Sequence, residues 1–160
     1  MGQEWKMQTR ADQIRQRRFA DRIEKRWASH QLSMKNTEDT AILDLRIEDR
    51  EGWQLGWIEV KHSKHGFGDY EWYFVAKSKW DELVRETTIC NQKCFLAVSF
   101  GCGTEAIADV KEVNGYGRIK VWGRTDRPEK KVITDYQCCV FIPQKLFKKF
   151  KGKVRPWNRN

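Results

Sequence analysis

Two runs of alternating residues, separated by a short polar turn, constrain the fold of this chain most strongly. In residues 40–48 (TAILDLRIE) apolar side chains recur at every second position, which is the side-chain period of a β-strand. Residues 53–61 (WQLGWIEVK) form a second such run, and residues 49–52 between them are typical of a turn. The sequence therefore predicts an antiparallel hairpin. The expected apolar face of its first strand consists of Ala41, Leu43, Leu45 and Ile47.

Helical spacing precedes the hairpin, and further strands follow it. Residues 8–32 carry apolar side chains three and four positions apart without Pro or Gly, which predicts a helix. A loop is expected at 33–39. The remaining predicted elements are strands at 70–76, 94–100, 106–113, 118–124 and 136–142, a helix at 79–86 capped by Ser78, and a last helix at 144–150 that follows Pro143. This order predicts an α/β fold with a mixed β-sheet flanked by helices.

The length of 160 residues predicts one domain over residues 1–151, followed by a basic tail over 152–160. No apolar run approaches the roughly 20 residues that span a bilayer, which excludes a membrane protein. The first 18 residues lack the apolar core of a secretory signal, so we expect a cytoplasmic or nucleoid- or nuclear-associated protein that is not secreted. In that reducing setting the five cysteines are expected to be structural, and a zinc site, for which no fourth ligand lies at a suitable spacing, is the alternative.

The charge of the chain indicates a polyanionic partner. There are 31 Lys and Arg against 22 Asp and Glu, which gives a net charge of +9. The excess gathers near both ends of the chain, where aromatic residues are interleaved with it, a pattern that suits phosphate contacts. The alternative is a solvated helix face and a soluble tail. Candidate residues for contacting nucleic acid are Arg15, Arg18, Arg22, Lys64, Lys148 and Lys149.

The candidate chemistry lies on the hairpin. Glu59 and Lys61 are two positions apart in a strand, so they point to one face while Ile58 and Val60 point to the other. If Glu51 and Gly52 form the centre of a tight turn, Asp44 lies opposite Glu59, with Cβ atoms roughly 4.5–5.5 Å apart.

Two carboxylates that close repel each other unless a cation lies between them. A hard divalent cation, Mg²⁺ or Mn²⁺, would satisfy Asp44 and Glu59, and the backbone carbonyl of Val60 would add a third oxygen. Such an ion neutralises phosphodiester charge and lowers the pKa of a bound water. Lys61 would then position that water and help to deprotonate it, or stabilise the transition state. Asp39 is a rival for the first acid, in a shifted register.

The order of helix, hairpin with Asp44 and Glu59-Val60-Lys61, strand, helix and strand resembles the PD-(D/E)XK nuclease superfamily over roughly residues 15–100. By this resemblance Asp44 takes the place of the first acid, and Glu59 and Lys61 form the Glu-x-Lys element. Leu43 stands where the motif has Pro. Members also place a Glu on the first helix near the metal, and Glu24 is the candidate here. The implied fold is a restriction-endonuclease-like core.

The function expected from this resemblance is a Mg²⁺- or Mn²⁺-dependent endonuclease that hydrolyses DNA phosphodiester bonds, of a restriction, repair, junction-resolving or homing type. Its catalytic residues would be Asp44, Glu59, Lys61 and Glu24. Cutting both strands takes two active sites, so the resemblance implies a homodimer or higher homo-oligomer. Two alternatives remain open at this point: a non-catalytic nucleic-acid-binding module with the same fold, and a domain whose basic surface binds an acidic protein.

Overall fold

The computed structural model describes residues 10–28, 33–36, 43–123 and 136–150. Its main feature is a six-stranded mixed sheet in the order β1-β2-β3-β5-β6-β9, in which β3 and β5 are parallel and the other neighbours antiparallel. The mixed sheet that the sequence predicted is thus confirmed. The strands are β1 (Ser33–Asn36), β2 (Leu45–Glu48), β3 (Gln54–Ser63), β5 (Lys93–Phe100), β6 (Glu105–Asp109) and β9 (Lys148–Lys149).

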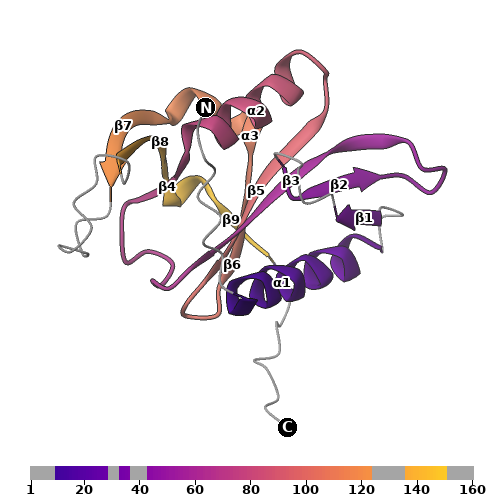
Figure 1. Ribbon diagram of the computed structural model, residues 1–160, viewed down its shortest axis with the longest axis horizontal. Helices are drawn as coiled ribbons and strands as arrows, with labels where there is room; N and C mark the ends of the chain where they lie inside the picture. Colours follow the sequence, from indigo (N-terminus) through magenta and orange to yellow (C-terminus); the bar gives the residue numbers. More distant parts are fainter. Residues whose placement is uncertain (1–9, 29–32, 37–42, 124–135, 151–160) are drawn as a thin grey trace, which may run out of the picture.

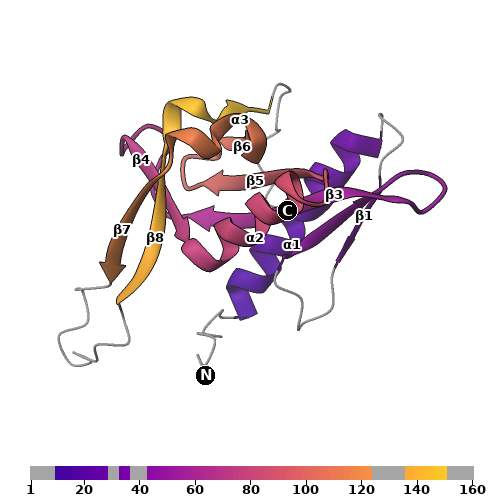
Figure 2. The ribbon, with the colours of Figure 1, turned by 90° about the horizontal axis from the view of Figure 1, so that it is seen from above.

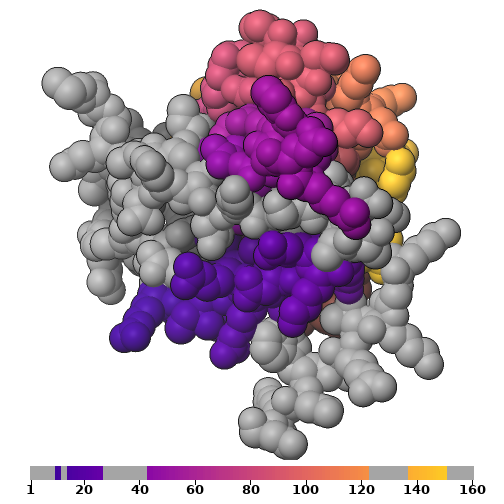
Figure 3. Space-filling model, turned by 90° about the vertical axis from the view of Figure 1, so that its right-hand side faces the viewer, coloured from indigo at the N-terminus to yellow at the C-terminus, as the bar shows by residue number. Residues whose placement is uncertain are grey.

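Helices cover the two faces of this sheet. Helix α1 (Arg10–Ala28) lies on one face, and α2 (Lys77–Thr88) with the short α3 (Val110–Val113) lies on the other (Figures 1 and 2). Seen from the side, α1 runs below the β2–β3 hairpin (Figure 3). Each helix buries an apolar stripe, as amphipathic helices against a sheet must. The α1 stripe consists of Phe19, Ala20 and Ile23, and that of α2 consists of Trp80, Leu83 and Thr87.

A second, three-stranded sheet in the order β4-β8-β7 stands apart from the hairpin (Figure 1). It consists of β4 (Trp72–Ala76), β8 (Tyr136–Pro143) and β7 (Arg118–Gly123), all antiparallel. Two 3₁₀ turns lie beside it, η1 (Asn114–Tyr116) and η4 (Gln144–Leu146). The sequence predicted these strands, but their separation into a sheet of their own is a finding of the structure.

The hairpin loop differs from the expected tight turn. The backbone N–H of Asp49 donates to the carbonyl of Trp53 (3.0 Å), so three residues, 50–52, form the loop. The Asp49 carboxylate accepts hydrogen bonds from the backbone N–H groups of Glu51 and Trp53 (2.9 Å each). Gly52 has a φ of 87°, the left-handed conformation that glycine adopts without steric cost.

A β-bulge then restores the register at the candidate site. The strands pair through Glu48↔Gln54, Ile47↔Gly56, Arg46↔Trp57 and Leu45↔Ile58. Leu55 is therefore an extra residue in β3. The bulge cancels the one-residue difference in the loop, so Leu45 pairs with Ile58, which is the register that the sequence predicted, and Asp44 directly precedes this last pair.

Several predicted elements were wrong in type. Residues 33–36 form a strand instead of a loop, because they pair with β2. Residues 110–113 form a helix, because the Asp109 carboxylate caps the N–H of Lys111 (2.9 Å). In place of a last helix, the chain makes a 3₁₀ turn at 144–146 and then pairs with β6. Helix α2 begins at Lys77 after Ala76, without a side-chain cap from Ser78.

Leu43 does not share a face with Leu45, contrary to the expected alternation. The chain bends at residues 43–44 before β2 begins, so Leu43 packs with α2-side residues and Leu45 with α1. Parts of the predictions lie outside the described residues, namely Asp39, Ala41, the ends of the first helix, and the basic tail at 152–160.

Candidate active site

The alternation of β3 sends Glu59 to the α2 face of the sheet. Ile58 and Val60 pack with Phe19 and Ile23 of α1. Glu59 points the other way, and its side chain is fully buried, with 0% exposure. A carboxylate is rarely buried to this degree without compensating partners, because its charged form loses the solvation of water.

The partners of Glu59 are two lysines that contact one of its oxygens. Glu59 Oε1 lies 2.5 Å from Lys61 Nζ and 3.6 Å from Lys79 Nζ, which α2 supplies. Both oxygens are buried, and neither has a hydrogen bond of good geometry to the described residues. The two lysines therefore face Oε1 as ion-pair partners, and no cation among the described residues is paired with Oε2.

Burial raises the pKa of the Glu59 carboxyl to about 7. The Lys61 and Lys79 cations oppose this shift, and the nearby Asp44 charge adds to it. The same environment keeps Lys61 protonated. Desolvation lowers its pKa, but the Glu59 and Asp44 charges more than offset that and hold it above the usual value. In this state Lys61 is a cation and hydrogen-bond donor, not a base.

Tyr73, in β4, lies on the same side of the structure. Burial, together with the Glu59 charge, raises its pKa above the ordinary range. Its phenol therefore stays neutral and can donate a hydrogen bond.

Asp44 is the residue directly before β2, where the chain does not yet pair with β3. Its Oδ2 accepts a hydrogen bond from the backbone N–H of Val60 (2.9 Å). The carbonyl of Val60 accepts a long hydrogen bond from Gln16 Nε2 of α1 (3.4 Å). Side chains thus satisfy backbone groups of β3 where no strand does. This brings the Asp44 carboxylate and the Val60 carbonyl to one gap at the edge of β3.

The residues at this gap fit a hard divalent cation. The donors are oxygens: the carboxylate of Asp44, Glu59 Oε2 and the carbonyl of Val60, the set that Mg²⁺ and Mn²⁺ prefer. A cation there would give Glu59 Oε2 the partner it lacks and would relieve the repulsion that Asp44 exerts. Within the described residues no three Asp, Glu, His or Cys side chains converge, so backbone and solvent oxygens would complete the coordination.

Helix α1 approaches the site through Gln16, not through Glu24. Glu24 is eight residues further on, about 12 Å along the helix axis. It is partly exposed, and no interaction among the described residues joins it to Glu59 or Lys61. Because α1 packs on the Ile58 and Val60 face, its side chains approach the sheet from the side opposite Glu59. The structure therefore does not bring Glu24 together with the other three predicted residues.

All six predicted basic residues except Arg22 are exposed, namely Arg15, Arg18, Lys64, Lys148 and Lys149. Three of the six lie beside partners from other parts of the chain. Arg22 pairs with the buried Glu105 (2.5 Å), Lys148 pairs with Glu112 (2.8 Å), and Lys149 lies over the Phe67 ring (4.9 Å).

Lys79, Tyr73 and Gln16 were missed in the sequence analysis. Each comes from an element other than the hairpin and meets it only through tertiary packing. Lys79 had one usable signal: its place in the first turn of a helix that follows a strand of the core.

Comparisons with known proteins give the family and the fold of this chain. A family described as "Phage putative PDDEXK endonuclease" matches residues 4–150. Among solved structures, Hjc from Archaeoglobus fulgidus, a Holliday junction resolvase from an archaeal hyperthermophile, is similar at a TM-score of 0.50. The identity is 12%, and the match covers 82% of this chain and 86% of that one.

No curated protein matches the sequence. Among the described residues, no helix has both the length and the apolar character needed to cross a membrane. The Hjc similarity supports a restriction-endonuclease-like fold. The family match spans nearly the whole chain, including the hairpin that carries Asp44, Glu59 and Lys61. The chain therefore belongs to this PD-(D/E)XK family, the one described as "Phage putative PDDEXK endonuclease".

Proposed function

We propose that this protein is a metal-dependent endonuclease that hydrolyses DNA phosphodiester bonds with Mg²⁺ or Mn²⁺. Asp44, Glu59 and the Val60 carbonyl would hold the ion. The observation that carries the proposal is the state of Glu59: a fully buried carboxylate whose oxygens have no hydrogen bond of good geometry, with lysines beside Oε1 alone and the Asp44 charge nearby. A buried charge left in this state is costly, and a cation held between Glu59 and Asp44 would offset that cost.

The bound ion would supply a Lewis acid and an activated water. The side chains have separate tasks. Asp44 keeps the edge of β3 in place by accepting the Val60 N–H. Lys61, whose raised pKa keeps it charged, would donate to the phosphate or the attacking water and stabilise the negative charge that develops. Lys79 contributes a second positive charge behind Glu59.

Two observations support DNA as the substrate: the net charge of the chain and its similarity to a solved structure. The net charge of +9 favours a polyanion, and Arg15, Arg18 and Lys64 present exposed cations. The similar structure from Archaeoglobus fulgidus is a Holliday junction resolvase, which acts on branched DNA. We further propose that the protein acts as a homodimer or higher homo-oligomer, because two strands require two active sites. Sedimentation of the protein with and without DNA measures this.

Plasmid cleavage tests the proposed function. Wild type should nick or linearise supercoiled or branched DNA with Mg²⁺ or Mn²⁺, and EDTA should abolish cleavage. Lys61→Ala and Asp44→Ala should each lose it. Lys77→Ala is the matched control, because Lys77 pairs with Asp81 on the surface of α2. A wild type that binds these DNAs without cutting any of them would refute the nuclease and favour the non-catalytic binding module.

A further inference from the structure

The three-stranded sheet exposes aromatic side chains on the face that points away from the core. Tyr73 and Val75 of β4 and Val140 and Ile142 of β8 point inward. The alternate residues point outward. We call this outward surface the aromatic face, defined by Trp72, Phe74, Phe141 and Trp122 together with Arg118 and Lys120.

The rings of the aromatic face form one continuous cluster across the three strands. The centroids of Phe74 and Phe141 are 5.6 Å apart, and that of Trp122 lies 6.0 Å from Phe74 and 5.8 Å from Phe141. Phe74 is 44% exposed and Trp122 is 49% exposed. Contiguous exposed aromatic surface is uncommon on a protein without a ligand for it, because it orders water unfavourably.

Cations alternate with these rings. The Arg118 guanidinium lies 4.9 Å from the centre of the Trp72 ring, and Lys120 Nζ lies 5.3 Å from that of Phe141. No carboxylate belongs to the aromatic face as defined. Flat rings interleaved with positive charges match a ligand that interleaves flat bases with phosphates.

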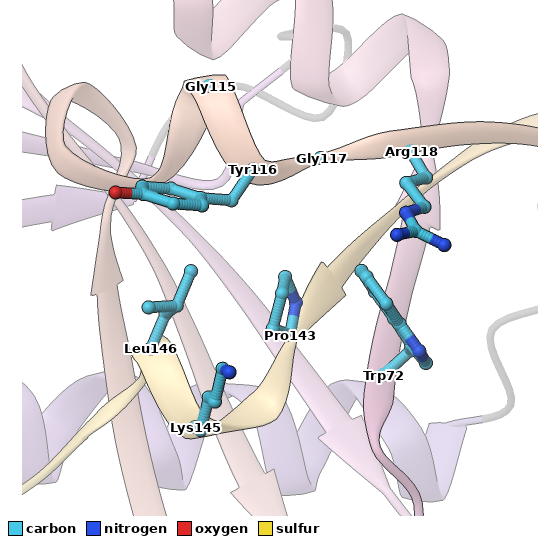
Figure 4. Close-up of a pocket in the computed structure, with 8 residues that line it drawn as sticks. All are labelled: Trp72, Gly115, Tyr116, Gly117, Arg118, Pro143, Lys145 and Leu146. Carbon is cyan, nitrogen blue, oxygen red and sulfur yellow. The ribbon is translucent and has the colours of Figure 1, made fainter.

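An open hollow of about 530 Å³ lies at the Trp72 end of the aromatic face. Figure 4 shows Tyr116 and Leu146 on one side of it and Trp72 with Arg118 on the other, with Pro143 between them. Lys145 adds a cation to the lining, and none of the described residues that line it is acidic. Its volume lies within the roughly 300–1,000 Å³ of small-molecule sites.

We propose that the aromatic face and this hollow bind unpaired nucleotides of a DNA strand, with bases stacked on Trp72 and Trp122 and phosphates held by Arg118, Lys120 and Lys145. A duplex does not fit this chemistry, because its bases are already stacked and paired. A second copy of the chain fits poorly, because a two-fold contact between identical faces would bury the Arg118 and Lys120 cations of both copies, and the residues that define this face include no carboxylate to pair with them.

Strand β4 links the aromatic face to the candidate active site. Tyr73 points to the Glu59 side while its neighbours Trp72 and Phe74 point outward. Helix α2 follows directly after β4, and its Lys79 contacts Glu59. This further step, which rests on the proposed function, makes the substrate a DNA in which unpaired nucleotides lie next to the bond that is cut.

Binding to a short fluorescein-labelled oligothymidylate, followed by anisotropy in EDTA, tests the proposal without requiring cleavage. Trp72→Ala and Trp122→Ala should each raise the Kd by about 5- to 100-fold, and Trp122→Phe should restore most of the affinity. The Kd for a blunt duplex should change less than about 2-fold. Trp53→Ala is the matched control, because Trp53 is 69% exposed at the hairpin loop, outside the aromatic face.

Unchanged oligothymidylate binding by both alanine variants, with melting curves like wild type, would overturn the proposal. An equal loss on duplex and single strand would also overturn it. If wild type sediments as a dimer and Trp122→Ala as a monomer, the face joins two copies and the proposal is wrong. A wild type that binds the oligonucleotide through this face but cuts no DNA would refute the nuclease alone.

Discussion

The six-stranded and the three-stranded sheet of this protein hold opposite kinds of exceptional residue. In the first, the exception is buried charge: Glu59 on β3 is fully buried, and Glu48 on β2 and Glu105 on β6 are nearly so. In the second, the exception is apolar surface outside: Phe74 and Trp122 on the aromatic face. Both arrangements are unfavourable for the isolated chain, the one through lost solvation and the other through exposed hydrocarbon. A bound ligand accounts for Glu59 and for the aromatic face, and the chemistry of each points to a different part of one substrate.

The two sheets also differ in how well their packing can offset an unfavourable residue. Glu59 is surrounded by the apolar contacts of β3 and β5, so the packing of the six-stranded sheet can compensate for the cost of burying its charge. The β7 edge of the three-stranded sheet has no such reserve, since Ile119 is 63% exposed and Val121 66% exposed. Changes in the first sheet should therefore affect catalysis or folding strongly, and changes at the β7 edge should affect binding alone.

The largest effect is expected for Glu59→Gln. This change keeps the side-chain volume and removes the charge that would hold the metal, so the cleavage rate should fall by about 100- to 1,000-fold or more. Folding should survive, because a buried charge is replaced by a neutral group. Single-turnover plasmid cleavage and thermal melting measure the two. Glu82→Gln, an acid paired with Arg85 on α2, is the control. A Gln variant with wild-type activity would remove Glu59 from the site.

The next largest effect is a difference in stability between a buried side chain of the six-stranded sheet and an exposed one of the three-stranded sheet. Leu96 of β5 is 0% exposed, so Leu96→Ala should lower the free energy of unfolding by about 2–5 kcal/mol. Ile119→Ala on β7 should change it by no more than about 0.5 kcal/mol, because the side chain already lies in water. Urea unfolding of both variants gives the comparison. Equal losses would mean that the β7 edge is packed in solution, and the contrast between the sheets would fail.

The hairpin and its site were predictable because they depend on local features. The period of two assigned Glu59 and Lys61 to one face, and that assignment is confirmed by the packing of Ile58 and Val60 on α1. The register of the hairpin agreed with the prediction through a cancellation. The loop is one residue longer than expected, and the bulge at Leu55 absorbs the difference. No sequence signal indicated the bulge.

What could not be predicted depends on contacts between distant segments. Gln16 reaches Val60 across 44 residues, and Lys79 reaches Glu59 from the first turn of α2, within the connection between β3 and β5. Glu24 was chosen because it borders the apolar stripe of α1, but the stripe packs on the face opposite Glu59. Periodicity tells which side chains share a face of one element. It does not tell which element that face will meet.

The pH dependence of the free energy of unfolding, measured in the metal-free protein, gives a third test. The Glu59 pKa of about 7 in the fold exceeds the ordinary 4.5, so the folded state binds this proton more tightly than the unfolded state. Its contribution to stability is therefore full below about pH 4.5 and is lost as the pH rises through 7, by up to about 3 kcal/mol.

Urea unfolding in EDTA across this range should show the loss in wild type and not in Glu59→Gln, so the difference between the two proteins isolates this group. The slope should shrink when Mg²⁺ is added, because the ion would stabilise the charged form. Parallel pH profiles for the two proteins would show that Glu59 titrates alike in the folded and unfolded states.

The smallest effect concerns Lys79, which supports Glu59 from α2. Its Nζ lies 3.6 Å from Glu59 Oε1, and the side chain is 28% exposed, so solvent screens the pair. Lys79→Met removes a charge that lowers the Glu59 pKa. A larger share of Glu59 is then protonated near neutral pH and competes with metal. The half-saturating Mg²⁺ concentration should rise by about 2- to 5-fold, as expected of a partly exposed pair, while the rate at saturating Mg²⁺ stays near wild type.

Lys77→Met is the matched control for Lys79→Met, because Lys77 begins the same helix but pairs with Asp81 on the surface. Cleavage rates measured over a Mg²⁺ series, at about one pH unit below and above the Glu59 pKa, distinguish the explanations. If Lys79 acts through the Glu59 proton, the shift in half-saturating Mg²⁺ is larger at the lower pH, where more Glu59 carries a proton. If Lys79 instead contacts DNA, the rate at saturating Mg²⁺ falls at both pH values, and the two sheets then share the work of holding the substrate.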